Sequence, residues 1–229
     1  MGRASKLLLS LAYGAVGGVR KAVLAAALLL ALPALAEPVN LAALGDSLTQ
    51  GYGLPPEEGF VPQLEAWLRD NGHDVSITNA GVSGDTTAGG LSRVGWTLTP
   101  EIRGMIVALG GNDMLRGIDP ANSRENLRGI LVAAREAGVE VLLVGIQAPG
   151  NYGPDYKAAF DNMYPELAEE FGTLHADNFF AGLAVEGDPS AAATYLQPDG
   201  LHPNAAGVSK IVAALGPKVA LLLDRIDRD

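Results

Sequence analysis

Short apolar runs alternate with longer amphipathic segments along most of the chain. The runs have the length of strands buried in a sheet, and the longer segments repeat their apolar residues at helical spacing. In the first of these segments, Phe60, Leu64 and Trp67 fall on one side of a helix. We therefore predict strands over residues 39–44, 75–79, 105–109, 139–146 and 173–176, and helices over residues 57–70, 86–98, 122–137, 155–171 and 205–223.

Several predicted helix ends carry residues that commonly start or stop a helix. Asn71-Gly72 and Gly138 should end the first and third helices, because glycine readily adopts the left-handed conformation that follows a helix. We expect Asp85 to cap the second helix and an Asn or Ser to cap the third. Pro217 lies inside the last predicted helix and should kink or split it.

The alternation of strands and helices predicts the fold class. Right-handed crossovers between such elements give an α/β fold, with a mostly parallel sheet and helices on both faces. The 229 residues suffice for one such domain and an extension at one end. In a parallel sheet, the loops that follow the strands gather at one edge, where functional residues usually lie.

The extension is at the N-terminus. Residues 1–36 hold four basic residues and no acidic one, and residues 22–36 carry no charge. A basic start, an apolar stretch and small residues at Ala34 and Ala36 are typical of a secretory signal cleaved before Glu37. An uncleaved membrane anchor is the alternative, but residues 22–36 are fewer than the roughly 20 that span a bilayer. We predict a signal peptide over residues 1–36 and a periplasmic or secreted domain over residues 37–229 without a stable membrane anchor.

The predicted domain is strongly acidic. Residues 1–36 hold four of the 16 basic residues and none of the 26 acidic ones, which leaves a formal net charge of −14 for the rest. Such a surface repels nucleic acid and anionic membranes. The chain has no cysteine, which excludes disulfides, a thiolate nucleophile and zinc sites built on cysteine.

Three short blocks follow the first three predicted strands and carry candidate chemistry. Gly45-Asp46-Ser47-Leu48-Thr49 places Ser47 at a strand end, although Asp and Ser are also ordinary cap and turn residues there. Residues 79–86 are rich in glycine, which lets the backbone point an N–H at a ligand or simply forms a turn. Residues 110–113 offer the amide of Asn112, a residue type that is also common in turns.

A fourth block, just before the last predicted helix, is more specific. Asp199 and His202 stand three residues apart, so one turn can carry both side chains and the carboxylate can hold the imidazole N–H. Of the three histidines in the chain, His73 and His175 stand at strand margins without a nearby motif, and we interpret them as structural. His202 is therefore the expected general base.

On the blocks that contain Ser47, Gly81, Asn112 and His202, the chain resembles the SGNH (GDSL-type) hydrolase family over nearly all of residues 37–229. It looks most like the branch of periplasmic acyl-CoA thioesterase I, lysophospholipases and arylesterases. The resemblance implies a flavodoxin-like α/β/α sandwich with a five-stranded sheet, and no metal or organic cofactor. It implies a small acyl ester or thioester as the substrate, and we expect a monomer.

The resemblance also implies roles for individual residues. Ser47 is the expected nucleophile, His202 its base and Asp199 the group that orients the base. The backbone N–H groups of Ser47 and Gly81 and the side-chain amide of Asn112 would form the oxyanion hole. The loop over residues 149–156 would line the acyl-binding groove, with the substrate-binding residues Asn151, Tyr152 and Gly153.

Two other functions compete with an ester or thioester hydrolase. The same site would suit a carbohydrate O-deacetylase, and the glycine-rich turns would suit a non-catalytic module that binds an anion. An anion cradle has no use for the Asp199–His202 pair, which favours an enzyme that forms an acyl-enzyme on Ser47. Ser47 is not in a Gly-x-Ser-x-Gly sequence, and this disfavours the ordinary α/β-hydrolase fold.

Overall fold

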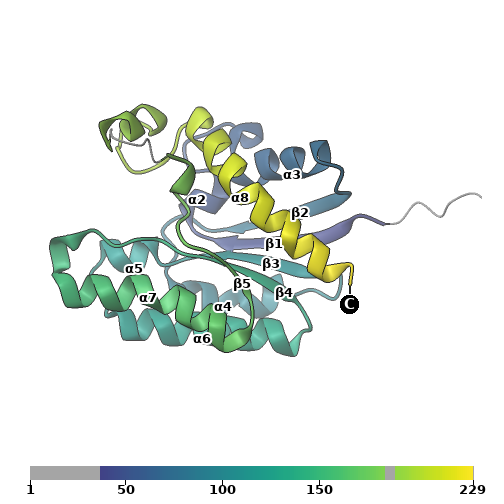
Figure 1. The fold of residues 1–229 in the computed structure, drawn as a ribbon, viewed down its shortest axis with the longest axis horizontal. Coiled ribbons are helices and arrows are strands. Elements are labelled where there is room, and N and C mark those ends of the chain that lie inside the picture. The colour runs from purple at the N-terminus through teal and green to yellow at the C-terminus, as the bar shows by residue number, and fades with distance from the viewer. Residues whose placement is uncertain (1–36, 184–188, 229) are drawn as a thin grey trace, which may run out of the picture. The chain divides into compact units, whose positions relative to one another are not determined.

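Five parallel strands form one sheet in the order β2-β1-β3-β4-β5 (Figure 1). The computed structural model describes residues 37–183 and 189–228, so the predicted signal peptide over residues 1–36 lies outside the described residues. The strands are β1 Val39–Gly45, β2 Val75–Gly81, β3 Gly104–Ala108, β4 Glu140–Val144 and β5 Leu174–Ala176. They coincide with the five apolar runs of the sequence. Every residue of β3 is buried, as expected for a strand covered on both faces.

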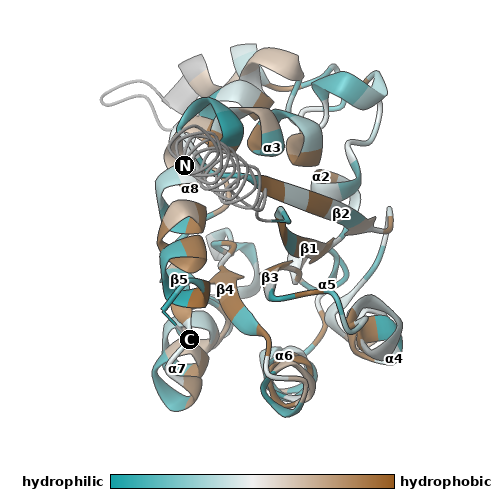
Figure 2. Cartoon of the chain, turned by 90° about the vertical axis from the view of Figure 1, so that its right-hand side faces the viewer, coloured by the Kyte–Doolittle hydropathy of each residue, from teal (hydrophilic) through white to brown (hydrophobic). Residues whose placement is uncertain are grey.

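Helices cover both faces of the sheet. α3 (Phe60–Asp70) and α8 (Ala205–Ile226) lie on one face, and α4 (Thr87–Thr97), α6 (Pro120–Glu136) and α7 (Pro154–Phe171) lie on the other (Figure 1). Each layer of helices shares a separate apolar core with the sheet. In Figure 2 the hydrophobic colour is concentrated in the strands between these two layers. The predicted three-layer α/β/α sandwich of the flavodoxin-like type is confirmed.

Several short helices have no counterpart in the predicted pattern. They are α2 (Ser47–Gln50), α5 (Gly111–Leu115) and the 3-10 helices η1 (Pro56–Glu58), η2 (Gly150–Tyr152), η3 (Ala181–Leu183) and η4 (Pro189–Tyr195). With three to seven residues each, they are too short to show a helical period. α2 and α5 matter most, because they begin two and three residues after the ends of β1 and β3 respectively.

Two of the predicted helix caps were wrong. α4 is capped by Thr86, whose hydroxyl accepts from the N–H of Gly89, because the Asp85 carboxylate is engaged by an arginine instead. α6 begins two residues earlier than predicted, at Pro120, and Asp119 caps it. The N–H of the first residue of a helix has no partner within the helix, so a proline, which lacks this N–H, costs no hydrogen bond at that position.

α8 continues through Pro217 from Ala205 to Ile226, so the expected split does not occur. Leu215 and Val219, on either side of the proline, are buried in the same core, and this packing holds the two halves together. α8 is long and apolar enough to cross a membrane by length and composition alone. Its buried residues face the sheet, which is the arrangement of a core helix in a folded domain.

The strand order creates a crevice at the carboxyl edge of the sheet. The chain moves from β1 outward to β2 and then returns to place β3 on the other side of β1. The loops after β1 and β3 therefore leave the sheet in opposite directions, and ligands bind at such switch points. Ser47 follows β1 and Asn112 follows β3, so the topology places both residues beside this crevice.

Candidate active site

Ser47 is the first residue of α2, and its neighbour Asp46 caps this helix. The Asp46 carboxylate accepts a hydrogen bond from the N–H of Leu48 at 3.0 Å. The first N–H groups of a helix have no partner within it, and that of Ser47 has none elsewhere in the described part of the chain. The turn thus presents both the hydroxyl and the backbone N–H of Ser47 at the carboxyl edge of the sheet.

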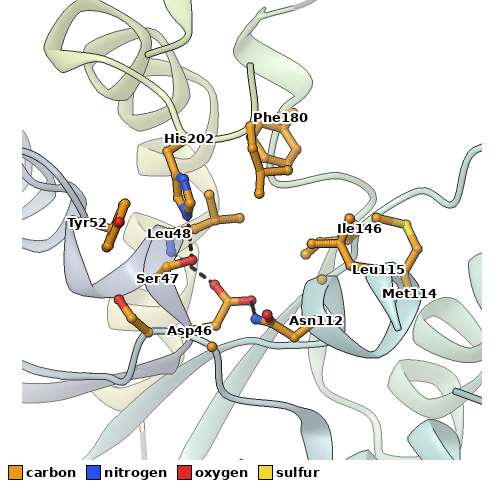
Figure 3. A pocket seen from close by; sticks show the side chains of 14 residues that line it. Asp46, Ser47, Leu48, Tyr52, Asn112, Met114, Leu115, Ile146, Phe180 and His202 are labelled. Atoms are coloured by element: carbon orange, nitrogen blue, oxygen red, sulfur yellow. Dashed lines mark hydrogen bonds between the residues drawn. The ribbon is translucent and has the colours of Figure 1, made fainter. Parts of the chain in front are cut away.

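Ser47, His202 and Asp199 form a continuous chain of hydrogen bonds. Figure 3 shows its first part, between Ser47 and His202. Ser47 Oγ lies 2.9 Å from His202 Nε2, and His202 Nδ1 lies 2.7 Å from Asp199 Oδ2. The carboxylate favours the tautomer with the proton on Nδ1, which leaves Nε2 free to accept from the serine hydroxyl. The structure therefore brings the three predicted residues together at hydrogen-bond distance.

The turn between Asp199 and His202 fixes the carboxylate. Its Oδ1 accepts from the backbone N–H groups of Leu201 and His202 at 2.9 and 3.0 Å. The side-chain hydrogen bond to His202, followed by these two backbone bonds, lowers the pKa of Asp199 to about 2. Gly200 has a φ of +68°, a left-handed conformation that suits glycine at this point of the turn. Asp199 is thus an anion at any pH near neutrality.

Asp46 is a second carboxyl group at the site, and it is almost fully buried with 2% of its surface exposed. Its Oδ2 accepts from Nδ2 of Asn112 at 3.3 Å, so Asn112 and Ser47 meet at the crevice (Figure 3). Burial raises the pKa of Asp46 to about 6, against the opposing effects of its hydrogen bonds and of His202. The sequence had suggested a cap at this position, but not the contact with Asn112.

The prediction for Gly81 requires a correction. Gly81 is the last residue of β2, and its N–H donates to Oδ1 of Asn79 at 2.9 Å, so it is not free to bind a substrate oxygen. The N–H groups of Ser83 and Gly84 have no partner within the described residues, and both residues line the cavity beside Ser47. Gly84 also has a φ of +80°, and Arg116 holds its carbonyl oxygen at 2.8 Å.

A cavity of about 220 Å³ opens beside Ser47 and His202. Asp46, Ser83, Gly84, Gly111 and Asn112 supply its polar atoms and backbone. Most of its wall is apolar and consists of Leu48, Tyr52, Met114, Leu115, Ile146 and Phe180, which Figure 3 labels, and of Leu201. These wall residues were not predicted from the sequence, because most of them come from separate loops without a shared motif. Leu48 and Leu201 lie within the first and fourth blocks, and Met114 directly follows the third, and this was the available signal.

The predicted substrate-binding residues Asn151, Tyr152 and Gly153 are not among the described residues that line this cavity. Tyr152 is instead 44% exposed and lies beside Gly117 and Leu115. Its ring lies against Gly117, where an added Cβ would come within 3.2 Å of it, and its hydroxyl is 3.5 Å from the carbonyl oxygen of Leu115. The loop therefore supports Leu115, which is part of the wall.

A parallel α/β/α sandwich with a Ser–His–Asp chain beside an apolar cavity has the architecture of an ester hydrolase of the serine type. Among the described residues, no group of three or more His, Cys, Asp or Glu side chains is placed to hold a metal ion.

Comparison with known proteins identifies the family. The model of the GDSL-like Lipase/Acylhydrolase family matches residues 43–209. The chain is 39% identical over 186 residues to "Esterase TesA" of Pseudomonas aeruginosa, covering 80% of this chain and 89% of that protein. It is 37% identical over 167 residues to "Thioesterase 1/protease 1/lysophospholipase L1" of Escherichia coli (strain K12), covering 72% of this chain and 76% of that protein.

Solved structures agree with this assignment. A crystal structure of TesA superposes with a TM-score of 0.71 at 38% identity, covering 80% of this chain and 99% of that one. The structure of AlinE4, a SGNH-hydrolase family esterase, gives a TM-score of 0.67 at 41% identity, covering 83% and 99%. The chain belongs to the GDSL-like lipase/acylhydrolase family, and it is an enzyme that hydrolyses ester bonds.

Proposed function

We propose that the protein hydrolyses carboxylic esters and thioesters with an apolar acyl group, through an acyl-enzyme on Ser47. The observation that carries this proposal is the unbroken chain from Ser47 Oγ through His202 to Asp199 at the mouth of the apolar cavity. A serine hydroxyl is a weak nucleophile at neutral pH and needs a base within hydrogen-bond reach. His202 is such a base, at 2.9 Å.

The reaction proceeds in two halves. In the first, His202 Nε2 takes the hydroxyl proton while Ser47 Oγ attacks the carbonyl carbon, and Asp199 stabilises the imidazolium that forms. The tetrahedral intermediate collapses, and the leaving alcohol or thiol receives the proton from His202. In the second half, His202 takes a proton from water, the resulting hydroxide attacks the acyl carbon, and the acid is released as Ser47 regains its proton.

The negative charge on the former carbonyl oxygen needs hydrogen-bond donors. We assign this role to the backbone N–H groups of Ser47 and Gly84 and to the side-chain amide of Asn112. Gly84 replaces Gly81 in the oxyanion hole, because the N–H of Gly81 is bonded to Asn79 whereas that of Gly84 has no partner in the described part of the chain. All three donors belong to residues that line the cavity.

The cavity wall favours an acyl chain over a sugar. Leu48, Met114, Ile146 and Phe180 offer no hydrogen-bonding side chain, whereas a carbohydrate would leave its hydroxyl groups without partners there. Relatives named as an esterase, an arylesterase and a thioesterase with lysophospholipase activity fit the same preference. This argues against the alternative of a carbohydrate O-deacetylase.

We propose a monomer, because Ser47, His202 and Asp199 of one chain already form the hydrogen-bonded chain. We further propose that residues 1–36 direct export and are removed, on the strength of their charge pattern and the small residues before Glu37.

A fluorophosphonate probe tests the nucleophile. We expect the probe to label Ser47, as mapped by mass spectrometry, and Ser47→Ala to lower kcat on p-nitrophenyl butyrate by up to about 10⁶-fold without loss of fold. Ser92→Ala is the matched control, because that serine lies on α4 and its hydroxyl donates to the carbonyl of Gly89. Ser47→Ala with more than a tenth of the activity would disprove the assignment.

A further inference from the structure

The catalytic steps above leave Asp46 without a role, although this carboxylate lies next to the nucleophile. Its two oxygens have different partners: Oδ1 accepts from the N–H of Leu48 and Oδ2 accepts from Nδ2 of Asn112. The first bond stays within the turn that carries Ser47. The second joins that turn to α5, 66 residues further along the chain.

Capping of α2 does not by itself require a buried carboxylate. Asn caps a helix about as well as Asp, and it carries no charge that must be taken out of water. Asp46 is 2% exposed, and burial raises the pKa of its carboxyl group to about 6. An acidic group is thus kept at a position that disfavours its ionised form. A function of the charge itself would explain its presence.

The contact with Asn112 supplies such a function. The two ends of a side-chain amide are chemically opposite, since the NH₂ group donates and the carbonyl oxygen accepts. A carboxylate only accepts, so it attracts the NH₂ end of Asn112 and repels the oxygen end. With one N–H of Nδ2 bonded to Asp46, the second N–H is left for the cavity that Asn112 lines.

The backbone beside Asn112 is adapted to this contact. A Cβ at Gly111 would lie 3.2 Å from Asp46 Oδ2, which is closer than most Cβ contacts, and at ordinary contact distance from Ile146. Glycine at this position therefore lets the start of α5 approach the carboxylate.

We propose that Asp46 is a positioning residue that fixes the Asn112 amide so that its N–H, and not its carbonyl oxygen, faces the oxyanion. The inference rests on the proposed role of Asn112 in the oxyanion hole. Because the oriented donor gains strength only as negative charge develops, its loss should lower kcat and leave KM nearly unchanged.

Asp46→Asn in the full-length protein tests the proposal. The variant keeps the size of the side chain and a capping oxygen, but its own NH₂ must then face either the N–H of Leu48 or Nδ2 of Asn112. We expect kcat on p-nitrophenyl butyrate to fall about 10- to 100-fold, with KM within about twofold and an unchanged or raised Tm. Asp119→Asn is the matched control, because Asp119 also caps a helix, α6, but is not among the residues that line the cavity. It should leave kcat unchanged.

A double-mutant cycle shows whether Asp46 acts through Asn112. Asn112→Ala alone should lower kcat by roughly 10²- to 10³-fold, and adding Asp46→Asn to it should cost less than about twofold more. If the two substitutions lower kcat independently, so that their factors multiply in the double variant, the inference is overturned. A normal kcat of Asp46→Asn would overturn it as well. In both cases the wild type and Asp119→Asn still hydrolyse the ester, whereas an inactive wild type would overturn the proposed function together with the inference.

Discussion

At the scale of single residues, the pKa values of two carboxyl groups near His202 are shifted in opposite directions. Asp199 is partly exposed and accepts three hydrogen bonds, and the first cause of its lowered pKa is the bond to His202. Asp46 is buried. Burial raises its pKa by more than its hydrogen bonds lower it. Environments that separate the pKa values of neighbouring acids commonly mark different roles in one site. In our proposal Asp199 orients the base His202, and Asp46 orients the oxyanion donor Asn112.

The raised pKa of Asp46 predicts a pH dependence of stability. An unfolded chain loses this proton near 3.8 and the folded protein near 6, so deprotonation between these values favours the unfolded state. The contribution of Asp46 to stability is therefore fully present below pH 4, falls as the pH rises to 6, and stays constant above that. The difference between the two pKa values corresponds to on the order of 3 kcal/mol.

Asp46→Asn isolates this effect, because the variant cannot ionise there. The free energy of unfolding of the variant minus that of the wild type, measured by urea denaturation, should increase between pH 4 and pH 6 and then level off. A difference that is flat from pH 4 to pH 7 would contradict the assigned pKa.

The contact between Asp199 and His202 was easier to predict from the sequence than the free N–H after β2, for a physical reason. Asp199 and His202 share one turn, so their contact depends on local spacing alone. In the block over residues 79–86, at the end of β2, Gly81 and Gly84 are equally plausible donors by residue type. Which N–H is free depends on the side-chain conformation of Asn79, and spacing does not encode that. The wall residues, such as Phe180 and Ile146, depend on how distant loops meet.

At the scale of elements, Arg93 of α4 joins the ends of two strands behind the site. Its guanidinium donates to the carbonyl oxygens of Gly45 at 2.9 Å and Ala80 at 2.7 Å, and to the Asp85 carboxylate at 2.7 Å. Gly45 ends β1 two residues before Ser47, and Asp85 directly follows Gly84. This arginine therefore sets the distance between two of the proposed oxyanion donors.

Arg93→Lys should weaken both fold and catalysis. A lysine ammonium cannot reproduce the planar fork that reaches three acceptors, so at least one carbonyl oxygen loses its partner. We expect a loss of about 1–3 kcal/mol in unfolding free energy and a kcat lowered by roughly tenfold at similar KM. Arg69→Lys is the control, because Arg69 bonds to Glu65 and to the carbonyl of Val75 at the opposite end of β2. An Arg93→Lys variant with lower stability and a normal kcat would show that Arg93 contributes to folding and not to catalysis.

The regular elements were predictable because each one is encoded by its own local pattern. The strands are buried apolar runs, and α3 repeats its apolar residues along one face. The short helices α2 and α5 were not predictable in this way, because tertiary contacts define them. Asp113 of α5 is fully buried and accepts from Thr87 and Ser123, which belong to two other helices. Such a network depends on the assembled fold and leaves no periodic signal in the sequence.

At the scale of the whole molecule, the site collects residues from distant parts of the chain at one edge of the sheet. The turns after β1, β2 and β3 supply Ser47, Gly84 and Asn112, and the segment before α8 supplies Asp199 and His202. Parallel strands all end at the same edge, so three of the four blocks had to converge there. The fourth reaches that edge because α8 runs back along the sheet and starts beside it (Figure 1).

This arrangement predicts that residues 1–36 are dispensable for folding and catalysis. All strands and helices of the described chain lie between Val39 and Ile226, and every residue of the proposed site lies within that range. A protein that begins at Glu37 should therefore keep the kcat, KM and Tm of the full-length chain.

If residues 1–36 are a secretory signal, the exported protein should also begin at Glu37, as N-terminal sequencing would show, because Ala34 and Ala36 supply the small residues that signal cleavage requires. Full-length protein with Met1 intact in membrane fractions would instead favour an uncleaved anchor, and a shortened protein that fails to fold would show that residues 1–36 belong to the domain.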